Sequence, residues 1–416
     1  MKRVSAGTFV VATSFLVATA IGIPVLATDG DLDPTFGDGG TVTTMFPVGS
    51  FATAAAVQPN GKIVVVGSAA GPSISGEFAV ARYTPDGMLD DRFGDGGTVT
   101  TSIGPGGGDE ARAVAIQSNG RIVVAGTDSW QRFAVVRYLS DGSLDPTFGG
   151  NGVVRTNFTH GDDVAWDMAL QPDGKVVAVG AAGYGQTGFQ LARYRHDGAL
   201  DPTFGDGGTV VTRYHGANAR AVVLQPNGRI VVAGYQPGGL ALARYLPSGR
   251  LDPTFAGDGT IAPVARTWAL AVARQPDGRI VVGGSIDIFD FGLARFLPDG
   301  RLDRSFGGDG EIKQHVEGLE QAVNGIEVQS DGRISATGSS GPHEFGDTTI
   351  PRFALIRRLA DGRRDPTFGV NGEVKTFFDG GAHAFGSTTD LEGRVVVVGG
   401  AGVDARDTFA LARYHV

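Results

Sequence analysis

One sequence unit occurs seven times along the chain, and this repetition restricts the fold more than any other feature. Variants of LDPTF begin at Leu32, Leu89, Leu144, Leu200, Leu251, Leu302 and Arg364. Segments such as FAVVRY contribute one Arg per unit, at Arg82, Arg137, Arg193, Arg244, Arg295, Arg357 and Arg413. A tight-turn Gly, often within QPDG or QPNG, occurs at Gly61, Gly120, Gly174, Gly228, Gly278, Gly332 and Gly393. The three landmarks keep one order, with 51 to 62 residues between successive arginines, which is typical of a repeat architecture.

Each unit predicts four short β-strands. In AVAIQSNGRIVVAG two apolar runs flank S-N-G, and in most units this turn is P-D-G or P-N-G, where Gly supplies the left-handed position. FAVVRY follows as a third strand, and TVTT, VVRT or TVVT follows LDPTF as the fourth. The strands are rich in Val, Ile, Thr and aromatic residues. Their apolar residues run continuously, which indicates sheets that are covered on both faces.

The seventh unit is divided between the two ends of the sequence, and this division distinguishes a closed ring from an open β-solenoid. The sequence stops at DTFALARYHV, whereas the missing LDPTF and fourth strand occur in TDGDLDPTFGDGGTVTT near its start. An open array has no reason to divide a repeat in this way. We therefore predict an all-β fold, a single seven-bladed β-propeller of four-stranded blades. The N-terminal strand near residues 41–44 would join the C-terminal blade, formed near residues 385–389, 394–399 and 409–414, and hide the last open sheet edge.

The repeats also resemble a known family. Segments of the type QPDGK, FALARY, LDPTFG and GDGGTV, in this order, are similar to the delta-60 repeat, a propeller unit of exported bacterial proteins. The resemblance covers essentially all of residues 30–416, and it implies a propeller fold and an exported location. It implies no catalytic residue, because the biochemical role of the family is uncharacterised. The chain departs from the pattern at DLEGR in the last turn and at Asp91, Arg304 and Arg364 in the LDPTF segments.

The first 27 residues differ from the rest of the sequence. MKR supplies a cationic start, and the apolar, uncharged run VSAGTFVVATSFLVATAIGIPVLA follows. Val25 and Ala27 are small residues placed for cleavage before Thr28, and Pro24 also favours cleavage over an uncleaved membrane anchor. We therefore expect residues 1–27 to be a signal peptide and residues 28–416 to be a secreted, extracellular propeller. No stable membrane insertion is expected after cleavage.

Composition excludes several functional classes. The absence of Cys excludes disulfides and thiolate metal sites, and a net charge of -9 argues against nucleic-acid binding. DGDLDPTFGDGG begins with the spacing of a calcium loop, but Pro34 replaces the turn Gly and Gly40 replaces the bidentate Glu. The GDGG segments lack the Lys-Ser/Thr and the helix of a phosphate loop. We expect a monomer that needs no metal and no cofactor.

Residues present in every unit are expected to serve the architecture. The strand arginines and the LDPTF aspartates should be paired or hydrogen-bonded to backbone, because an unpaired charge among packed strands is costly. The sequence does not show whether each Arg meets the Asp of its own blade or of the next. The Phe of each LDPTF should be an apolar plug beneath its blade. The aspartates are Asp33, Asp90, Asp145, Asp201, Asp252, Asp303 and Asp365, and the phenylalanines are Phe36, Phe93, Phe148, Phe204, Phe255, Phe306 and Phe368.

A binding site should use residues that differ between units. Antiparallel connectivity places the repeated turns on one face and the variable loops, such as NFTHGDDVAWD and RYHGAN, on the other. We therefore predict ligand binding on the variable-loop face near the central opening, because amphipathic aromatic residues anchor interfaces. The ligand would be an unknown extracellular protein, a carbohydrate or cell-wall material. The candidate residues are Trp130, Trp166, Trp268, His160, His215, His383, Asp162 and Asp163.

An enzyme, either a hydrolase or a lyase, is the alternative function. No G-x-S-x-G or H-E-x-x-H motif occurs, and no Cys is present to act as a nucleophile. A propeller enzyme would need His160, His215 and Asp162 or Asp163 to converge from separate loops. We name no catalytic residue, and the sequence favours a non-catalytic binding scaffold. A purely structural role at the cell surface is a third possibility.

Overall fold

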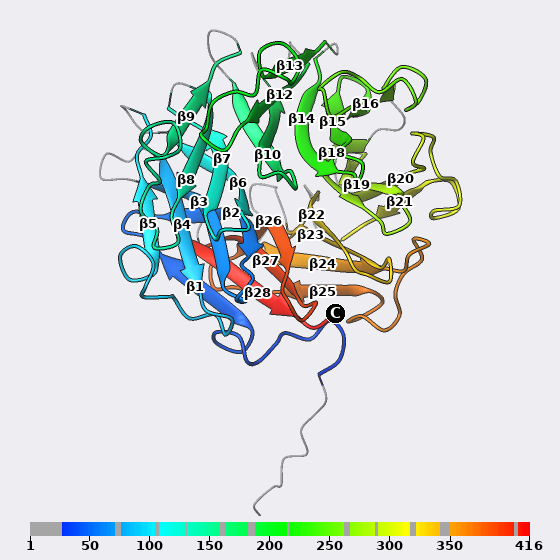
Figure 1. The fold of residues 1–416 in the computed structure, drawn as a ribbon. Helices are drawn as coiled ribbons and strands as arrows, with labels where there is room; N and C mark the ends of the chain where they lie inside the picture. The colour runs from blue at the N-terminus through cyan, green and yellow to red at the C-terminus, as the bar shows by residue number, and fades with distance from the viewer. Residues whose placement is uncertain are drawn as a thin grey trace, which may run out of the picture.

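The described chain forms a ring of seven antiparallel four-stranded sheets (Figure 1). The computed structural model describes residues 27–70, 76–104, 108–129, 131–158, 163–181, 188–213, 216–261, 267–287, 290–316, 322–341, 350–402 and 407–416. Every regular element in these residues is a β-strand. The predicted all-β, seven-bladed β-propeller is therefore confirmed.

The strands follow the chain order predicted from the repeats. Blade 1 consists of β2 (Ser50–Val57), β3 (Ile63–Ala70), β4 (Gly76–Tyr83) and β5 (Thr98–Thr101). Blade 2 consists of β6 (Glu110–Ile116), β7 (Ile122–Thr127), β8 (Phe133–Tyr138) and β9 (Val153–Thr156). Blade 3 consists of β10 (Val164–Leu170), β11 (Val176–Ala181), β12 (Phe189–Tyr194) and β13 (Thr209–Thr212). Blades 4 and 5 consist of β14 (Asn218–Leu224), β15 (Ile230–Gln236), β16 (Gly239–Tyr245) and β17 (Thr260–Ile261); and β18 (Thr267–Arg274), β19 (Ile280–Ile286), β20 (Asp290–Phe296) and β21 (Glu311–Gln314). Blades 6 and 7 consist of β22 (Val323–Val328), β23 (Ile334–Ser340), β24 (Arg352–Arg358) and β25 (Glu373–Thr376); and β26 (Ala382–Thr389), β27 (Val395–Ala401), β28 (Thr408–Tyr414) and β1 (Thr41–Met45).

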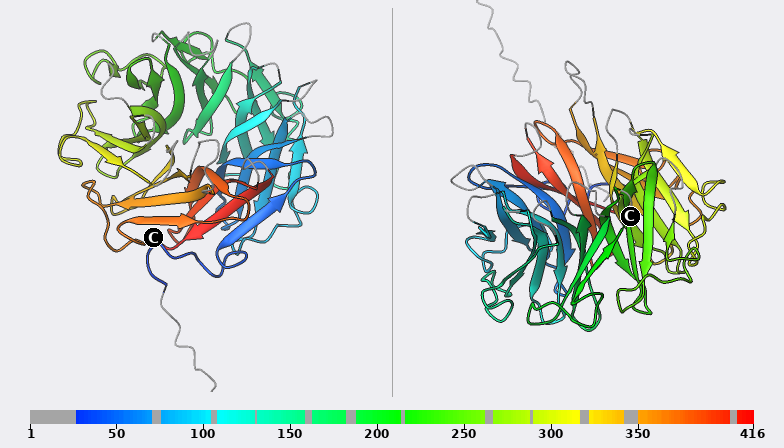
Figure 2. Two further views of the ribbon diagram at one scale, coloured as in Figure 1. Left: turned by 180° about the vertical axis from the view of Figure 1, so that it is seen from behind. Right: turned by 90° about the horizontal axis from the view of Figure 1, so that it is seen from above.

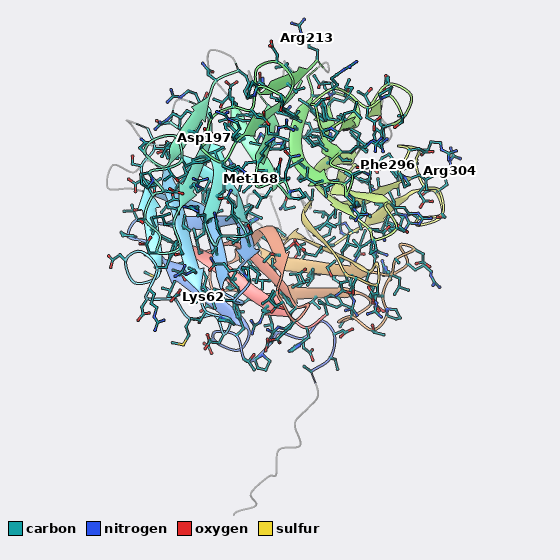
Figure 3. All side chains as sticks on the ribbon, viewed as in Figure 1. Lys62, Met168, Asp197, Arg213, Phe296 and Arg304 are labelled. Carbon is teal, nitrogen blue, oxygen red and sulfur yellow. The ribbon has the colours of Figure 1, made fainter. Side chains whose placement is uncertain are left out.

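The first strand of each blade in this order lies innermost. These strands, β2, β6, β10, β14, β18, β22 and β26, contact one another around the central opening (Figure 1). Figure 3 shows the radial direction, with Met168 of β10 near the centre of the ring and Arg213, which directly follows the outermost strand β13, at its rim. Side chains of the innermost strands are therefore the ones that can reach the channel along the axis.

The hydrophobic core lies between the blades. In the described part of the chain, buried apolar side chains form seven clusters, each of which joins the facing sheets of two neighbouring blades. The second strands are buried along nearly their whole length, as in β7, where all six residues are buried. This confirms that the continuous apolar runs reflect sheets covered on both faces. Every blade thus depends on both neighbours for its core, which favours closure of the ring.

The two ends of the sequence together form blade 7, as predicted. Strand β1 pairs antiparallel with β28, with Thr41 opposite Ala412 and Met45 opposite Thr408, and the ring also looks closed from behind (Figure 2). The turn before LDPTF also forms in blade 7, although its residues come from the two ends of the sequence. The Gly30 N–H donates to the His415 carbonyl (2.7 Å) and the His415 N–H to the Asp31 carbonyl (3.0 Å). In blade 1 the same two bonds form within one continuous turn.

Each repeated Arg pairs with the Asp of its own blade, which answers the question that the sequence left open. The Nε–Oδ2 distance is 2.8 Å for Arg137–Asp145 and 2.9 Å for Arg193–Asp201. In blade 7 the partners come from opposite ends of the sequence, since Arg413 Nε donates to Asp33 Oδ2 at 2.9 Å. All seven guanidinium groups also lie over the buried Phe ring of LDPTF, at 4.4 to 4.7 Å from its centroid.

The same guanidinium groups connect neighbouring blades. Arg137 Nη1 donates to the His196 carbonyl (2.6 Å) and Arg193 Nη1 to the Pro247 carbonyl (2.6 Å), both in the turn of the following blade. The contact from Arg413 to the Pro85 carbonyl continues this pattern across the closure of the ring. The repeated Arg and Asp are thus structural, because one buried side chain links its own strand, its own LDPTF turn and the next blade.

The aspartates are held in their charged form. Burial alone would raise the pKa of Asp145, but the Thr147 hydroxyl and N–H and the Arg137 guanidinium bind its carboxylate and lower the pKa to about 2. A second cation also reaches the carboxylate, since Arg121 Nε lies 2.7 Å from Asp145 Oδ2. Each such Asp stabilises the fold fully above the pKa of an unfolded Asp, near 4. That contribution is lost as the pH falls through the folded-state value.

Removal of residues 28–46 should open blade 7. The deletion removes β1, Asp33 and Phe36, and it exposes the edge of β28, so we expect aggregation or loss of the folded state. The matched control is a permuted chain in which Asp29–Phe46 is fused directly after Val416, so that blade 7 becomes continuous. Size-exclusion chromatography and thermal unfolding compare the two. A deletion variant that stays monomeric with an unchanged Tm would contradict closure by β1.

Substitution Arg244→Ala should destabilise the protein by about 3 kcal/mol, because it removes one partner of a buried ion pair. We expect the lower end of the range for such pairs, because Arg229 still contacts Asp252 at 2.6 Å. Arg301→Ala is the control, since that side chain is 74% exposed and pairs with Asp299, so its loss should cost less than about 1 kcal/mol. Equilibrium denaturation measures both. Equal losses in the two variants would show that Arg244 is not a structural link.

Candidate functional site

Several residues predicted for the site lie outside the described residues. These are Trp130, His160, Asp162 and His215, and their predicted place in the variable loops stays a prediction. The described candidates are Trp166 on β10, Trp268 on β18, His383 on β26 and Asp163, which directly precedes β10. Three of these four lie on innermost strands, so the described geometry concerns the channel rather than the loop tips.

Each innermost strand carries a β-bulge at the same position of the repeat. The pairing with the second strand shifts register by one residue, so that one residue of the innermost strand has no partner. A bulge of this kind re-aims the side chain of the extra residue. The bulge residues are Thr53, Arg112, Trp166, Arg220, Leu270, Asn324 and Phe385.

A repeated glycine permits each bulge. It lies on the second strand, opposite the residue that precedes the bulge, where the two backbones approach closely. A Cβ atom on Gly234 would lie 1.8 Å from the Asn218 carbonyl oxygen, and one on Gly284 would lie 1.7 Å from the Trp268 carbonyl oxygen. No larger residue fits there without moving the strand. The set is Gly67, Gly126, Gly180, Gly234, Gly284, Gly338 and Gly399.

The bulge residues of all seven blades line one cavity of about 520 Å³ on the axis of the ring. Its wall differs from blade to blade. Arg112, Trp166 and Arg220 form a basic and aromatic side, whereas Phe385, together with Phe51 of the adjacent blade, forms an apolar side. The two Phe rings meet edge to face, with centroids 5.9 Å apart. The channel is therefore chemically asymmetric although the scaffold repeats, which is what a single site on such a ring requires.

Trp166 lies between two guanidinium groups. Arg112 Cζ is 4.2 Å and Arg220 Cζ is 3.5 Å from the indole ring centroid, and the two arginines come from the blades that flank blade 3. Arg220 also donates from Nη2 to the Tyr235 hydroxyl (2.8 Å), and Tyr235 stacks on Trp268 at 5.2 Å. Trp166 and Trp268 are thus connected through blade 4. Sequence alone gave no indication of this connection.

The two arginines differ in their counter-charges. Arg112 pairs with Glu110, which precedes it on β6. Burial lowers the pKa of Arg112, while the Glu110 carboxylate raises it and the like charge of Arg220 lowers it. Within the described part of the chain, no carboxylate pairs with Arg220. The Nε atoms of both arginines are buried without a hydrogen-bond partner in the same part of the chain. The channel therefore holds one guanidinium charge that is not neutralised by an ion pair.

Two carboxyl groups of the channel wall bind protons more tightly than usual. Burial raises the pKa of Asp167 to about 7, although the Val222 and Met168 N–H groups (both 2.7 Å) favour its charged form. Burial likewise raises the pKa of Glu327 to about 7, and the hydroxyls of Thr389 (3.0 Å) and Ser387 (3.2 Å) only partly oppose this. Such groups can exchange protons near neutral pH.

Two further candidates lie near the start of innermost strands, outside the residues that line the cavity. Trp268 is 50% exposed and His383 is partly exposed, and both lie two residues before the bulge of their strand. The His383 ring stacks on Phe385 with centroids 6.4 Å apart. Both side chains are therefore at least partly accessible to solvent, and His383 contacts the cavity-lining Phe385.

Asp163 has a different position from the other described candidates. It is completely buried, and its Oδ2 accepts the N–H of Phe158 at 2.7 Å. Asp109 of blade 2 is also buried and accepts the N–H groups of Ile103 (2.6 Å) and Ser129 (2.7 Å). These aspartates order the start of the innermost strand, so we do not include Asp163 in the site.

Among the described residues, no group of three or more His, Asp or Glu side chains is placed to hold a metal ion. Asp29 and Asp33 of the loop with calcium-like spacing form ion pairs with Arg357 and Arg413. Across the described ranges, no helix has the length and apolar character needed to cross a membrane.

The repeats match a known family of β-propeller domains. Residues 58–93, 117–148, 171–204, 225–255 and 275–306, one segment from each of blades 1 to 5, match the model of a β-propeller domain of unknown function (DUF5122). This agrees with the predicted resemblance at the level of a repeat-propeller family. No curated protein sequence matches the chain.

Solved structures of other proteins share the fold. A streptogramin B lyase is 10% identical, with a TM-score of 0.52 over 90% of this chain and 97% of the lyase. Virginiamycin B lyase from Staphylococcus aureus is 10% identical, with a TM-score of 0.49 over 89% and 98%. YCF48 bound to a D1 peptide is 11% identical, with a TM-score of 0.49 over 94% and 100%. At such low identity the likeness concerns the propeller fold alone.

Substitution Glu327→Gln should stabilise the protein at pH 8 more than at pH 5. The pKa of Glu327 is raised on folding, so the wild-type protein loses stability as the pH rises from the unfolded-state value, near 4.3, through about 7. Gln cannot ionise, and it keeps hydrogen bonds with the Ser387 and Thr389 hydroxyls. Guanidinium denaturation at both pH values tests this. The control is Glu392→Gln, whose side chain is 71% exposed. Equal effects of Glu327→Gln at the two pH values would contradict the raised pKa.

Proposed function

We propose that this protein is a secreted, non-catalytic binding propeller. Its ligand, an extracellular protein, a glycan or cell-wall material, would enter the central channel from the variable-loop face. The observation that carries the proposal is the bulge position of the innermost strands. It delivers a different set of side chains to one cavity, whereas the Arg, Asp and Phe positions repeat in every blade. Positions that differ within a repeated scaffold are suited to recognition.

The site has the composition of a small-ligand site. Its volume of about 520 Å³ lies in the usual range for such sites, about 300–1,000 Å³. Aromatic side chains combined with Arg are also typical of binding hot spots. Trp166, Trp268 and His383 remain our proposed contact residues, and Arg112, Arg220 and Phe385 join them. Trp130, His160, His215 and Asp162 stay candidates from the sequence for the outer loops.

Export is the second part of the proposal. The cationic start and the apolar run of residues 1–27 support a cleaved signal peptide. The resemblance of the repeats to the delta-60 unit, which occurs in exported bacterial proteins, supports the same location. The chain has no Cys, so an oxidising environment would form no disulfide within it. Mass spectrometry of the protein secreted by an expressing bacterium would show whether its first residue is Thr28.

A hydrolase or lyase is the alternative function, and one observation favours it. Asp167 and Glu327 line the channel with pKa values raised to about 7, which suits general acid–base chemistry. Product analysis after incubation with a bound ligand decides between the two functions. Turnover by the wild-type protein that Glu327→Gln abolishes would establish the enzyme.

Trp166→Ala should weaken ligand binding by about 2 kcal/mol or more and change stability little, since Trp166 lines the cavity and is not a member of the apolar core between blades 2 and 3. Trp268→Ala should also weaken binding, because its half-exposed ring stacks on Tyr235, which holds the cavity-lining Arg220. A glycan and peptide array identifies the ligand, and calorimetry and denaturation then measure each variant. Met88→Ala is the control, as that side chain is 67% exposed on the face of repeated turns.

Two outcomes would contradict this assignment. If Trp166→Ala binds normally but loses about 3–5 kcal/mol of stability, the indole belongs to the core. If Met88→Ala abolishes binding and Trp166→Ala does not, the ligand occupies the face of repeated turns.

A further inference from the structure

The uncompensated guanidinium of Arg220 indicates what kind of ligand the channel takes. Arg220 lies at a bulge, partly buried, with Arg112 as a nearby like charge. Its polar contact in the described part of the chain is the neutral Tyr235 hydroxyl, and its other contacts are the rings of Trp166 and Tyr235. A cation removed from water is costly unless an anion accompanies it. The wall of the channel therefore has a place for a negative charge.

The carboxyl groups of the channel do not supply that charge. Glu110 is paired with Arg112. Asp167 accepts backbone N–H groups of Val222 and Met168, and Glu327 accepts hydroxyls of the neighbouring blade 7. Burial raises the pKa of both groups, and no guanidinium is among the neighbours that lower either pKa. Each carboxyl group thus has its own partners, and Arg220 is available for an external anion.

We infer that the channel binds an organic carboxylate with an apolar body, held by Arg220 and Arg112 and packed against Phe385 and Phe51. This inference rests on the proposed binding function and names its ligand class. A guanidinium edge offers parallel N–H donors that match a carboxylate. The buried Nε donors of both arginines lack partners, so a small rotation of either guanidinium toward a carboxylate would satisfy them.

The other side of the channel accounts for the apolar body. Phe385 is 37% exposed, and Phe51 meets it edge to face. On one side of the ring, two bulge positions lie between these side chains and Arg220: Leu270, and Asn324, whose amide donates to the Ala384 carbonyl. Because both faces of Trp166 are next to guanidinium groups, a ligand ring would pack on these side chains instead. A free carboxylic acid and the C-terminal carboxylate of a peptide that ends in an apolar residue share this chemistry.

Isothermal titration calorimetry with matched probes tests the inference. We expect 3-phenylpropionate to bind the intact protein, and its neutral amide and inorganic phosphate to bind at least tenfold more weakly. A Gly-Gly-Phe peptide and its C-terminal amide form the second pair. If 3-phenylpropionate is the only probe that binds, the ligand is a small carboxylic acid. If the Gly-Gly-Phe free acid is the only probe that binds, the ligand is the C-terminus of a peptide chain. Either result supports the carboxylate site.

Variants locate the binding. Arg220→Gln should reduce affinity for the acid at least tenfold, Arg220→Lys should reduce it less, and the exposed Arg301→Gln should leave it unchanged. Arg220→Gln should also unfold at the same or a higher temperature than the wild type, because it removes a charge that has no ion-pair partner, unlike Arg244. A lower Tm for Arg220→Gln with unaltered binding of the acid would show that Arg220 is structural and overturn the inference.

The inference and the proposed function fail in different ways. Equal binding of acid and amide, tight binding of phosphate, or no binding of any probe would overturn the carboxylate site. In each of these cases the binding propeller itself would stand if Trp166→Ala still weakened an array ligand. Loss of that second effect would overturn the proposed function as well.

Discussion

The repeated guanidinium is the interaction on which the ring depends. In each blade it binds the Asp eight residues later, or Asp33 in blade 7, and covers the Phe of the same LDPTF turn. In most blades it also donates to a carbonyl of the next blade. The Asp would be hard to keep charged at this depth without such partners, and its pKa is low because they are present. One side chain thus fixes a turn and sets the position of the neighbouring sheet. The contact from Arg413 to Pro85 continues this link from blade 7 to blade 1 and so closes the ring.

Much of the fold could be predicted because the same strand and turn signals recur in seven units, so a weak signal in one unit is supported by the others. Turn residues, strand residues and the divided seventh unit gave the number of blades, their strand order and the role of β1. The sequence could not show whether Arg82 pairs with Asp90 of its own blade or with the Asp of the next blade. That choice depends on the distance between the two blades, which packing sets and spacing along the chain does not. The loops around Trp130 and His160 lie outside the described residues, so their predicted roles stay predictions.

The cavity wall depends on the bulges, which the sequence analysis does not predict. The sequence predicts Trp166 as a site residue because it follows a variable loop. In the structure, Trp166 lines the channel because the register shift of β10 leaves it without a partner in the β-ladder. Arg112 and Arg220 are not among the residues predicted from the sequence, because that prediction rests on the variable loops and both arginines lie within strands. When the seven units are aligned on the Gly that ends IVVAG, the residue one step past its partner differs between most units, but the residue one step before that partner differs as well. The alignment alone therefore does not single out the bulge position.

The bulge also separates recognition from stability. A regular innermost strand would place its residues alternately against the neighbouring blades, and any change at such a position would disturb the core. The extra residue of each bulge has no partner in the β-ladder. The glycine on the second strand allows the backbones of the two strands to approach closely there. Arg244 and Arg220 illustrate the result in one blade. The first has a carboxylate, a hydroxyl and a ring around it, and the second faces a cavity and pairs with no carboxylate of the described residues. The same residue type is therefore a structural link at one radius of the blade and a recognition element at another.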